Sequence, residues 1–272
     1  MNIQLLSDLH LEVAPGFVPR PAPGADVLVL AGDVGAHTPR SRLGADPARG
    51  DFGLSRFSPR LGWPTPVLYV PGNHEYDGQP FEAVHARLQA LCAELGIVWL
   101  EGQVWQAPGT SVRFIGSTLW ADFDALGRQP EARRKAHSAA NWYLQTTGST
   151  IGGVPLLAEQ VRTLALQSQD WLRHALTAPQ PDGTPFTGQT VVVTHFAPST
   201  RSADPRYGLT PGTAGFCNAL DDLLPHADLW LHGHLHCKSD YRAGRCRVVA
   251  NPLGYANKGE QAAFDGQLVL RV

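Results

Sequence analysis

Short, almost wholly apolar runs recur along this chain, and each of them stops at a polar or turn-forming residue. The clearest run is 26–31, Asp-Val-Leu-Val-Leu-Ala, which is followed by Gly32 and Asp33. Runs of this kind fit strands that are buried on both faces, as in sheets covered by helices. We therefore expect strands at residues 3–7, 26–31, 66–70, 97–100, 104–106, 112–117, 190–194, 229–231, 247–250 and 267–272.

Segments with helical periodicity stand between these runs. Within residues 81–95, one apolar stripe is formed by Val84, Leu88, Leu91 and Leu95. Two further helices are expected, at residues 131–144 and 156–176. Because strands and helices alternate along the early part of the chain, the fold class is expected to be α/β with a largely buried sheet.

The organisation of the chain favours one domain. Its 272 residues, 43% of them hydrophobic, are enough to bury a substantial core. No linker divides the chain, so we expect a single domain over 1–272. The segment at about 122–155 lies between two halves built of strands and helices, and we expect it to be an insertion that acts as a lid over a site.

Composition indicates which kinds of partner and which cellular location to expect. The 22 basic and 24 acidic residues give a net charge of −2, without the basic excess that binding to a nucleic acid polymer requires. No apolar run approaches the roughly 18 residues of a membrane span, so no membrane association is expected. The spacing of the four cysteines fits neither a zinc motif nor a disulfide framework, which favours a cytoplasmic protein.

Polar residues with metal-binding side chains follow five of the expected strands. In open α/β sheets, ligands bind in the crevice outside the carboxyl ends of the strands, so we expect these residues to converge. The motifs are Asp8-Leu9-His10, Gly32-Asp33, Gly72-Asn73-His74-Glu75, His195 and Gly233-His234-Leu235-His236.

The spacing within these motifs suits metal ions. Residues two apart on an extended chain point to the same face, so Asp8 and His10 could bind one ion, as could His234 and His236. A mixture of carboxylate, imidazole and amide oxygen suits Mn, Fe, Zn, Co or Ni. The candidates are too many for one tetrahedral ion and suit two ions that share a carboxylate. They are Asp8, His10, Asp33, Asn73, His195, His234 and His236.

In order and spacing, these motifs resemble the five motifs of the calcineurin-like metallophosphoesterases, over residues 8–236. The flanking stretches 7–12, 194–199 and 251–255 resemble a bacterial branch of that family, which consists mostly of small phosphodiesterases. The resemblance implies the metallo-dependent phosphatase fold. That fold is a four-layer αββα sandwich of two mixed sheets, with the site at one edge.

The resemblance also implies roles for the matched residues. One metal would be held by Asp8, His10 and His236, and the other by Asn73, His195 and His234. Asp33 would bridge the two ions and serve catalysis. His74 would lie over the substrate phosphate and donate a proton to the leaving group. The implied reaction is in-line attack on phosphorus by a hydroxide that bridges the metals.

Substrate recognition is where this chain departs from the family pattern. Relatives often carry His at the position of Phe196 and Arg at the position of Leu253. Both changes remove polar groups near the expected site. Relatives also often carry Asn and Tyr at two positions of the insertion, which makes these residues candidate substrate contacts. The full set of candidate contacts is Asn73, His74, Asn141 and Tyr143.

Small phosphate esters are the expected substrates, with phosphodiesters first. Phosphomonoesters are the alternative, because the same centre serves both reactions. A scaffold that keeps the fold without chemistry is disfavoured, since all seven candidate ligands are present. The motifs set neither the natural substrate, nor the native metals, nor the oligomeric state.

Overall fold

Two large sheets hold the expected strands in the computed structural model, which describes residues 1–43, 50–180 and 182–272. In the first sheet the strand order is β13-β1-β2-β3-β4. Neighbouring strands are parallel from β1 to β4, and β13 is antiparallel to β1. The strands are β1 (Asn2–Leu6), β2 (Val27–Ala31), β3 (Val67–Val70), β4 (Val98–Trp99) and β13 (Val269–Arg271).

The second sheet has the order β11-β12-β10-β9-β6-β5. Its four central strands are parallel and its two edge strands are antiparallel to their neighbours, so both large sheets are mixed. The strands are β5 (Gln103–Gln106), β6 (Val112–Ser117), β9 (Gln189–Thr194), β10 (Leu229–His232), β11 (Ser239–Ala243) and β12 (Cys246–Ala250).

Alternating side chains of β2 show why its apolar run is continuous. Val27 and Val29 belong to the core between the two sheets. Leu28 and Leu30 belong to the core on the opposite face, together with residues of the first long helix. Because successive side chains of a strand point to opposite faces, a strand covered on both sides needs apolar residues at every position.

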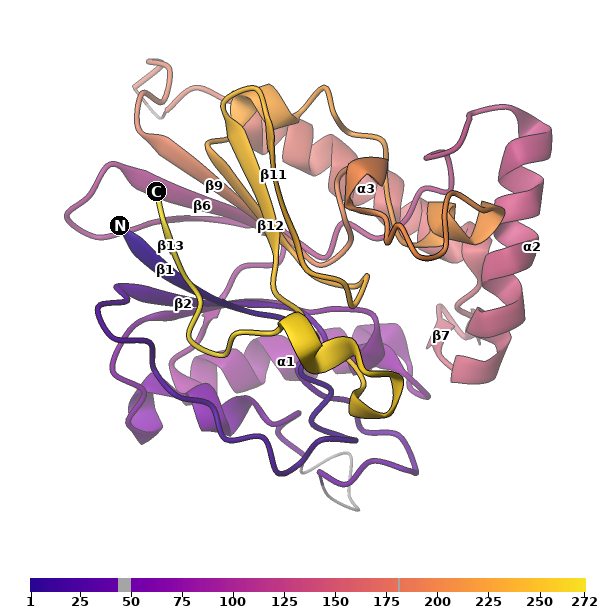
Figure 1. Cartoon of the computed structure of the whole chain (residues 1–272), viewed down its shortest axis with the longest axis horizontal. Helices are drawn as coiled ribbons and strands as arrows, with labels where there is room; N and C mark the ends of the chain where they lie inside the picture. Colours follow the sequence, from indigo (N-terminus) through magenta and orange to yellow (C-terminus); the bar gives the residue numbers. More distant parts are fainter. Residues whose placement is uncertain (44–49, 181) are drawn as a thin grey trace.

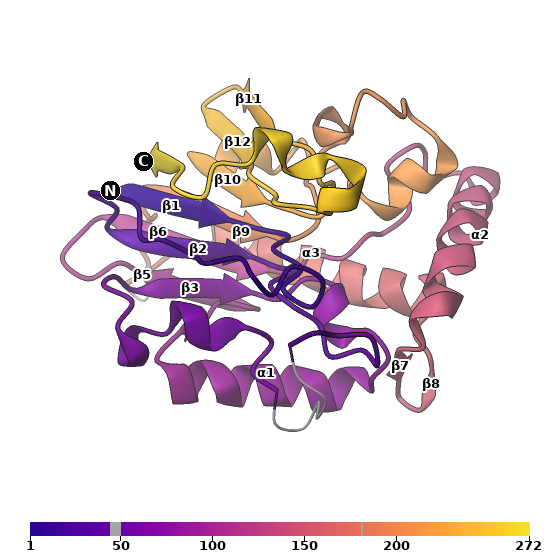
Figure 2. The same ribbon diagram turned by 60° about the horizontal axis from the view of Figure 1, so that its bottom comes forward.

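Helices cover the outer faces of the sandwich. Helix α1 (Phe81–Leu95) packs on β4 of the first sheet and buries the expected stripe except Leu95, which is half-buried. Helix α3 (Ala158–Thr177) packs on β6 of the second sheet. The layers therefore run helix, sheet, sheet, helix (Figure 2), which confirms the expected αββα sandwich.

The segment expected to be an insertion stands beside the sandwich (Figure 1). It contains helix α2 (Pro130–Thr147) and a hairpin of β7 (Thr150–Ile151) and β8 (Val154–Pro155). The helix contacts α3 and the 3-10 helical segment Pro211–Gly215. That this segment acts as a lid stays a prediction.

Among the described residues, no helix has both the length and the apolar character that a membrane span requires.

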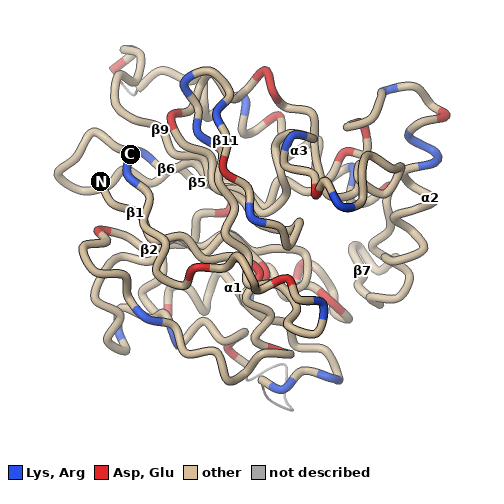
Figure 3. The backbone as a smooth tube through the Cα atoms, viewed as in Figure 1, with Lys and Arg blue, Asp and Glu red and all other residues tan. Residues whose placement is uncertain are grey.

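Charged residues of both signs are interspersed along the described chain (Figure 3). Some of them form ion pairs across neighbouring strands, as Arg247 of β12 does with Asp240 of β11 at 2.7 Å. A charged binding site on this chain would therefore be a local group of side chains and not a whole face of the molecule.

Candidate metal centre

Side chains that follow β1, β2, β3, β9 and β10 converge at one edge of the two sheets. Within each of two groups, the nearest ligand-type atoms all lie within 4.8 Å of one another. One group is Asp8, His10, Asp33 and His236, and the other is Asp33, His195 and His234. Asn73 joins the second group, since its Oδ1 lies 3.2 Å from Nε2 of His195. The structure thus brings together all the residues predicted as ligands.

Asp33 lies between the two groups. Its Oδ2 is 3.2 Å from Nε2 of His195 and 3.8 Å from Nε2 of His10. Its Oδ1 accepts a hydrogen bond from the backbone amide of His74 at 2.9 Å. One carboxylate therefore faces histidines of both groups, which is the placement that two neighbouring cations with a shared ligand require.

Unpaired buried atoms test whether these residues fit a metal. Oδ2 of Asp8 and Nε2 of His234 are buried and have no hydrogen-bond partner among the described residues. Nε2 of His10 and Nε2 of His236 face each other at 2.9 Å. Buried polar atoms without partners are unfavourable, and nitrogen and carboxylate oxygen are good ligands for transition metals. The donor set fits cations at this position.

The opposite ring nitrogens of the histidines are held by acceptors. Nδ1 of His10 donates to Glu12 at 3.1 Å, and Nδ1 of His236 donates to Glu260 at 2.7 Å. Nδ1 of His195 donates instead to the backbone carbonyl of Ala31 at 2.9 Å. Such contacts fix the tautomer and leave Nε2 as a ligand atom. Glu260 belongs to no motif that the sequence shows, and Glu12 lies at the end of the flanking stretch 7–12.

The backbone at the site is in an unusual conformation. Nine described residues other than glycine have a positive φ, and five of these are predicted ligands. The left-handed region is unfavourable for residues with a Cβ, so these turns depend on their surroundings. Hydrogen bonds from the amides of Asp8 and His10 to the carbonyls of Gly32 and Asp33, at 3.0 and 3.1 Å, help to hold them. The five ligands are Asp8, His10, Asp33, His234 and His236.

Three motif glycines allow the side chains to approach closely. A Cβ added at Gly72 would collide with the carboxylate of Asp33. At Gly32 it would collide with the ring of His195, and at Gly233 it would collide with the carboxylate of Asp8. Glycine is therefore required at these strand ends for space.

Electrostatics favour the metal-binding protonation state of Asp8 and His234, but not that of His195. Burial by itself would raise the pKa of Asp8, but a hydrogen bond with His236 and the nearby histidines outweigh it and lower this pKa to about 2. Burial holds the pKa of His234 well below its usual value, so its ring is neutral. For His195, the carboxylates of Asp33 and Asp8 outweigh the effect of burial and raise the pKa to about 9.

His74 lies beside the two groups and belongs to neither. Its Nδ1 donates to Oδ2 of Asp77 at 2.6 Å, and its Nε2 lies 3.4 Å from the hydroxyl of Tyr143. Burial alone would lower the pKa of His74, but the carboxylates of Asp33 and Asp77 outweigh it and raise the pKa to about 10. The imidazole is therefore protonated near neutral pH.

Phe196 and Leu253, the two residues at which relatives often carry polar side chains, have apolar surroundings. The ring of Phe196 lies 4.0 Å from the ring of His234, and Phe216 lies 5.0 Å from the same ring, measured between centroids. His234 thus contacts two aromatic rings. Leu253 is partly buried against the apolar core.

A cleft of about 780 Å³ opens at the ligand groups. Three of the four candidate substrate contacts, Asn73, His74 and Tyr143, line it, and their contact with substrate stays a prediction. Asn141 does not line it. The Oδ1 of Asn141 accepts a hydrogen bond from the amide of Ala158 at 2.7 Å, so this side chain holds the start of α3.

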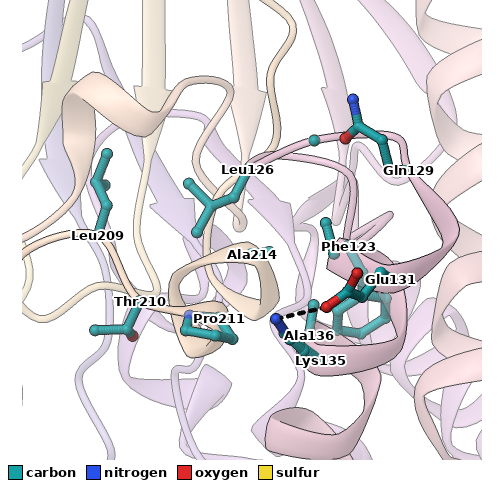
Figure 4. A pocket seen from close by; sticks show the side chains of 12 residues that line it. Phe123, Leu126, Gln129, Glu131, Lys135, Ala136, Leu209, Thr210, Pro211 and Ala214 are labelled. Atoms are coloured by element: carbon teal, nitrogen blue, oxygen red, sulfur yellow. Dashed lines mark ion pairs between the residues drawn. The ribbon is translucent and has the colours of Figure 1, made fainter.

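A second cavity, of about 370 Å³, lies between the start of α2 and the segment 209–214 (Figure 4). Leu126, Leu209 and Pro211 contribute apolar surface to it. Lys135, which also lines it, forms an ion pair with Glu131 at 2.9 Å. None of the predicted ligands lines this cavity.

Comparisons with known proteins show the fold and the family of this chain. The solved structure of phosphopantetheinyl hydrolase (PptH) from Mycobacterium tuberculosis superposes with a TM-score of 0.71 at 20% identity, covering 100% of this chain and 95% of that chain, which shows a shared fold. A curated protein of Acanthamoeba polyphaga mimivirus, L509, is 24% identical over 206 residues, or 71% of this chain and 69% of that protein. The family model of calcineurin-like phosphoesterases matches residues 1–238, and the chain therefore belongs to the calcineurin-like phosphoesterase family.

Proposed function

We propose that this protein is a phosphoesterase that depends on two metal ions and hydrolyses small phosphate esters, preferably phosphodiesters. The observation that carries the proposal is the pair of ligand groups that share Asp33 at the base of a cleft, with His74 beside them. The mixed nitrogen and oxygen donors suit Mn, Fe, Zn, Co or Ni.

Each ion has its own ligands in this proposal. Asp8, His10 and His236 would hold one ion, Asn73, His195 and His234 would hold the other, and Asp33 would serve both. Such ions, when bound, make a coordinated water more acidic and offset negative charge on the phosphate oxygens.

His74 acts on the leaving group in this proposal. Its imidazolium donates a proton to the oxygen that departs from phosphorus, since a leaving alkoxide is a strong base. Asp77 holds Nδ1 at 2.6 Å, so the proton available for transfer is on Nε2. That nitrogen faces the cleft, where Tyr143 lies 3.4 Å away.

The charge of the cleft supports a preference for diesters. A phosphomonoester carries close to two negative charges near neutral pH, because its second pKa is about 6, whereas a diester carries one. Among the described residues that line the cleft there is no arginine, and Lys258 is the single lysine. Phe196 and Leu253 add no charge where relatives often have a histidine and an arginine. The cleft, with a volume of about 780 Å³, has room for the second ester group of a diester.

Metal analysis and two chromogenic esters test this proposal. The purified protein should contain close to two equivalents of transition metal and lose both metal and activity in Asp33→Ala. We expect kcat/KM for bis(4-nitrophenyl) phosphate to exceed that for 4-nitrophenyl phosphate, with Mn²⁺ supplied. The reverse ratio would support a phosphomonoesterase. Metal-loaded protein that hydrolyses neither ester would support a scaffold.

A further inference from the structure

Aromatic side chains that remain exposed in this structure gather around the cleft. Four described aromatic residues are substantially exposed: Trp142 at 80%, Tyr207 at 70%, Phe216 at 44% and Tyr143 at 42%. All of them except Trp142 line the cleft of the metal centre. Exposed aromatic surface at a concave site is typical of ligand binding, because the ligand removes that surface from water.

Local hydrogen bonds hold the segment that bears Tyr207 and Phe216. Asp204 accepts hydrogen bonds from the guanidinium of Arg206 at 2.6 and 2.8 Å, and its carbonyl accepts from the amide of Tyr207 at 3.2 Å. Further along, the carbonyl of Thr213 accepts from the amide of Phe216 at 3.0 Å. The segment is thus fixed by its own contacts while the two rings stay open to solvent.

The aromatic surface begins at the ligand groups. The ring of Phe216 lies 5.0 Å from that of His234 and inclined to it by 33°. Phe216, Tyr207 and His234 line one continuous cleft. A phosphate ester bound at the ligand groups would therefore place one of its substituents against Phe216 and Tyr207.

We propose that Tyr207 and Phe216 form a subsite for a planar aromatic substituent of the phosphate ester. The subsite deepens the proposed phosphoesterase function and rests on it for the identity of the ester. Aromatic rings prefer offset-stacked or edge-to-face partners, an arrangement that a flat ring provides and a puckered aliphatic ring does not. Thr210 and Thr213 also line the cleft, and their hydroxyls hold the start of the 3-10 helical segment Pro211–Gly215, which carries the chain to Phe216.

Two phosphinates that cannot be hydrolysed test the subsite. Diphenylphosphinate and dicyclohexylphosphinate carry the same charge and the same number of ring carbons, but only the first has planar rings. Binding of each to the metal-loaded protein is measured by calorimetry. We expect diphenylphosphinate to bind about fivefold more tightly, within the range of aromatic pair interactions.

Variants then locate the preference. Tyr207→Leu keeps apolar surface without the aromatic ring. It should lower the ratio of the dissociation constant of dicyclohexylphosphinate to that of diphenylphosphinate from about five to near one. Tyr207→Phe should keep the ratio of the unaltered protein. Trp142→Ala is the matched control, because Trp142 is exposed and does not line the cleft. Phe216→Leu should also lower the ratio, with metal content measured in parallel because Phe216 contacts His234.

The outcomes separate the subsite from the function. Equal affinity for the two phosphinates in the unaltered protein would overturn the subsite, and so would an equal loss of preference in Trp142→Ala and Tyr207→Leu. Neither result would contradict the proposed phosphoesterase function, which is tested separately by the hydrolysis of bis(4-nitrophenyl) phosphate. A preference that depends on Tyr207, in protein that hydrolyses no ester, would keep the subsite and overturn the proposed function.

Discussion

Nδ1 of His236 donates a hydrogen bond to Oε2 of Glu260 at 2.7 Å. The same oxygen accepts from the amide of Tyr255 at 2.8 Å, so the carboxylate is itself held in place. On the same ligand group, Glu12 accepts from Nδ1 of His10 at 3.1 Å. Carboxylates in this position orient an imidazole and make its other nitrogen a stronger ligand.

Replacing Glu260 should therefore weaken metal binding without removing any ligand. Glu260→Gln is expected to lower the affinity for Mn²⁺ by about 10- to 100-fold, the usual cost of losing such a partner. Calorimetric titration of metal-free protein measures this affinity. The control is Glu131→Gln, whose side chain pairs with Lys135 at the second cavity. Equal affinities in the two variants would contradict the assigned role.

A methyl group at residue 72 should disable the centre. A Cβ there collides with the carboxylate of Asp33, which both ligand groups use. Gly72→Ala is expected to lose metal and activity together. Gly16→Ala is the matched control, because nothing lies within 4 Å of the added Cβ. Metal content after gel filtration measures the effect, and a fully loaded Gly72→Ala protein would show that Asp33 is not a ligand.

Removing the His74 side chain should separate metal binding from turnover. His74→Asn is expected to retain both ions and to lose about 10²- to 10⁴-fold in kcat, the usual contribution of a general acid. The loss should be larger for esters with a basic leaving group than for 4-nitrophenyl esters, since a 4-nitrophenolate leaves without protonation. A loss that is equal for both kinds of ester would argue against proton donation by His74.

Metal affinity should rise with pH. His195 has a pKa of about 9, above its usual value of 6.5, so the metal-free ring is protonated near neutral pH. Binding an ion requires its neutral form and releases this proton. The affinity should therefore increase by up to about tenfold per pH unit until about pH 9. Calorimetry in buffers of different ionisation enthalpy counts the released proton, and a count of zero at pH 7 would refute the prediction.

Glu101 should make stability fall as pH rises. Its carboxylate accepts hydrogen bonds from the hydroxyls of Ser117 and Thr118, but burial outweighs them and raises its pKa from 4.5 to about 7. A folded-state pKa above the unfolded value favours folding at low pH, and this contribution is lost as pH rises through about 7. Relative to the unaltered protein, Glu101→Gln should therefore gain in free energy of unfolding between pH 5 and pH 8.

Urea denaturation at the two pH values measures this difference. The control is Glu94→Gln, because the side chain of Glu94 is 59% exposed. If Glu101→Gln and Glu94→Gln show the same change between pH 5 and pH 8, the carboxylate of Glu101 does not titrate as described.

The sequence predicted the sheets well because most of their strands are buried on both faces. An edge strand with one open face gives a weaker signal. Strand β11, Ser-Asp-Tyr-Arg-Ala, was not predicted, because its sequence is mostly polar and its side chains alternate between half-buried and exposed. It forms by pairing with β12, a partner that no local pattern in residues 239–243 reveals.

The ligand groups could be predicted since each member follows directly on an apolar strand. Contacts between distant segments could not. Glu260 is 24 residues beyond His236 and belongs to no motif, and its role depends on how the chain returns to the site. Asn141 was expected to contact substrate, but its amide oxygen is used at the start of α3, which is a packing relation across 17 residues.

The five ligand residues with left-handed backbone have a consequence for the lifetime of the protein. Each such residue costs roughly 1–2 kcal/mol, and the net stability of a folded domain is only about 5–15 kcal/mol. Ions that bind the folded chain alone would add stability by mass action. We therefore expect the metal-free protein to be the fragile form, so that metal supply governs how long the chain survives heat and proteases as well as whether it can react.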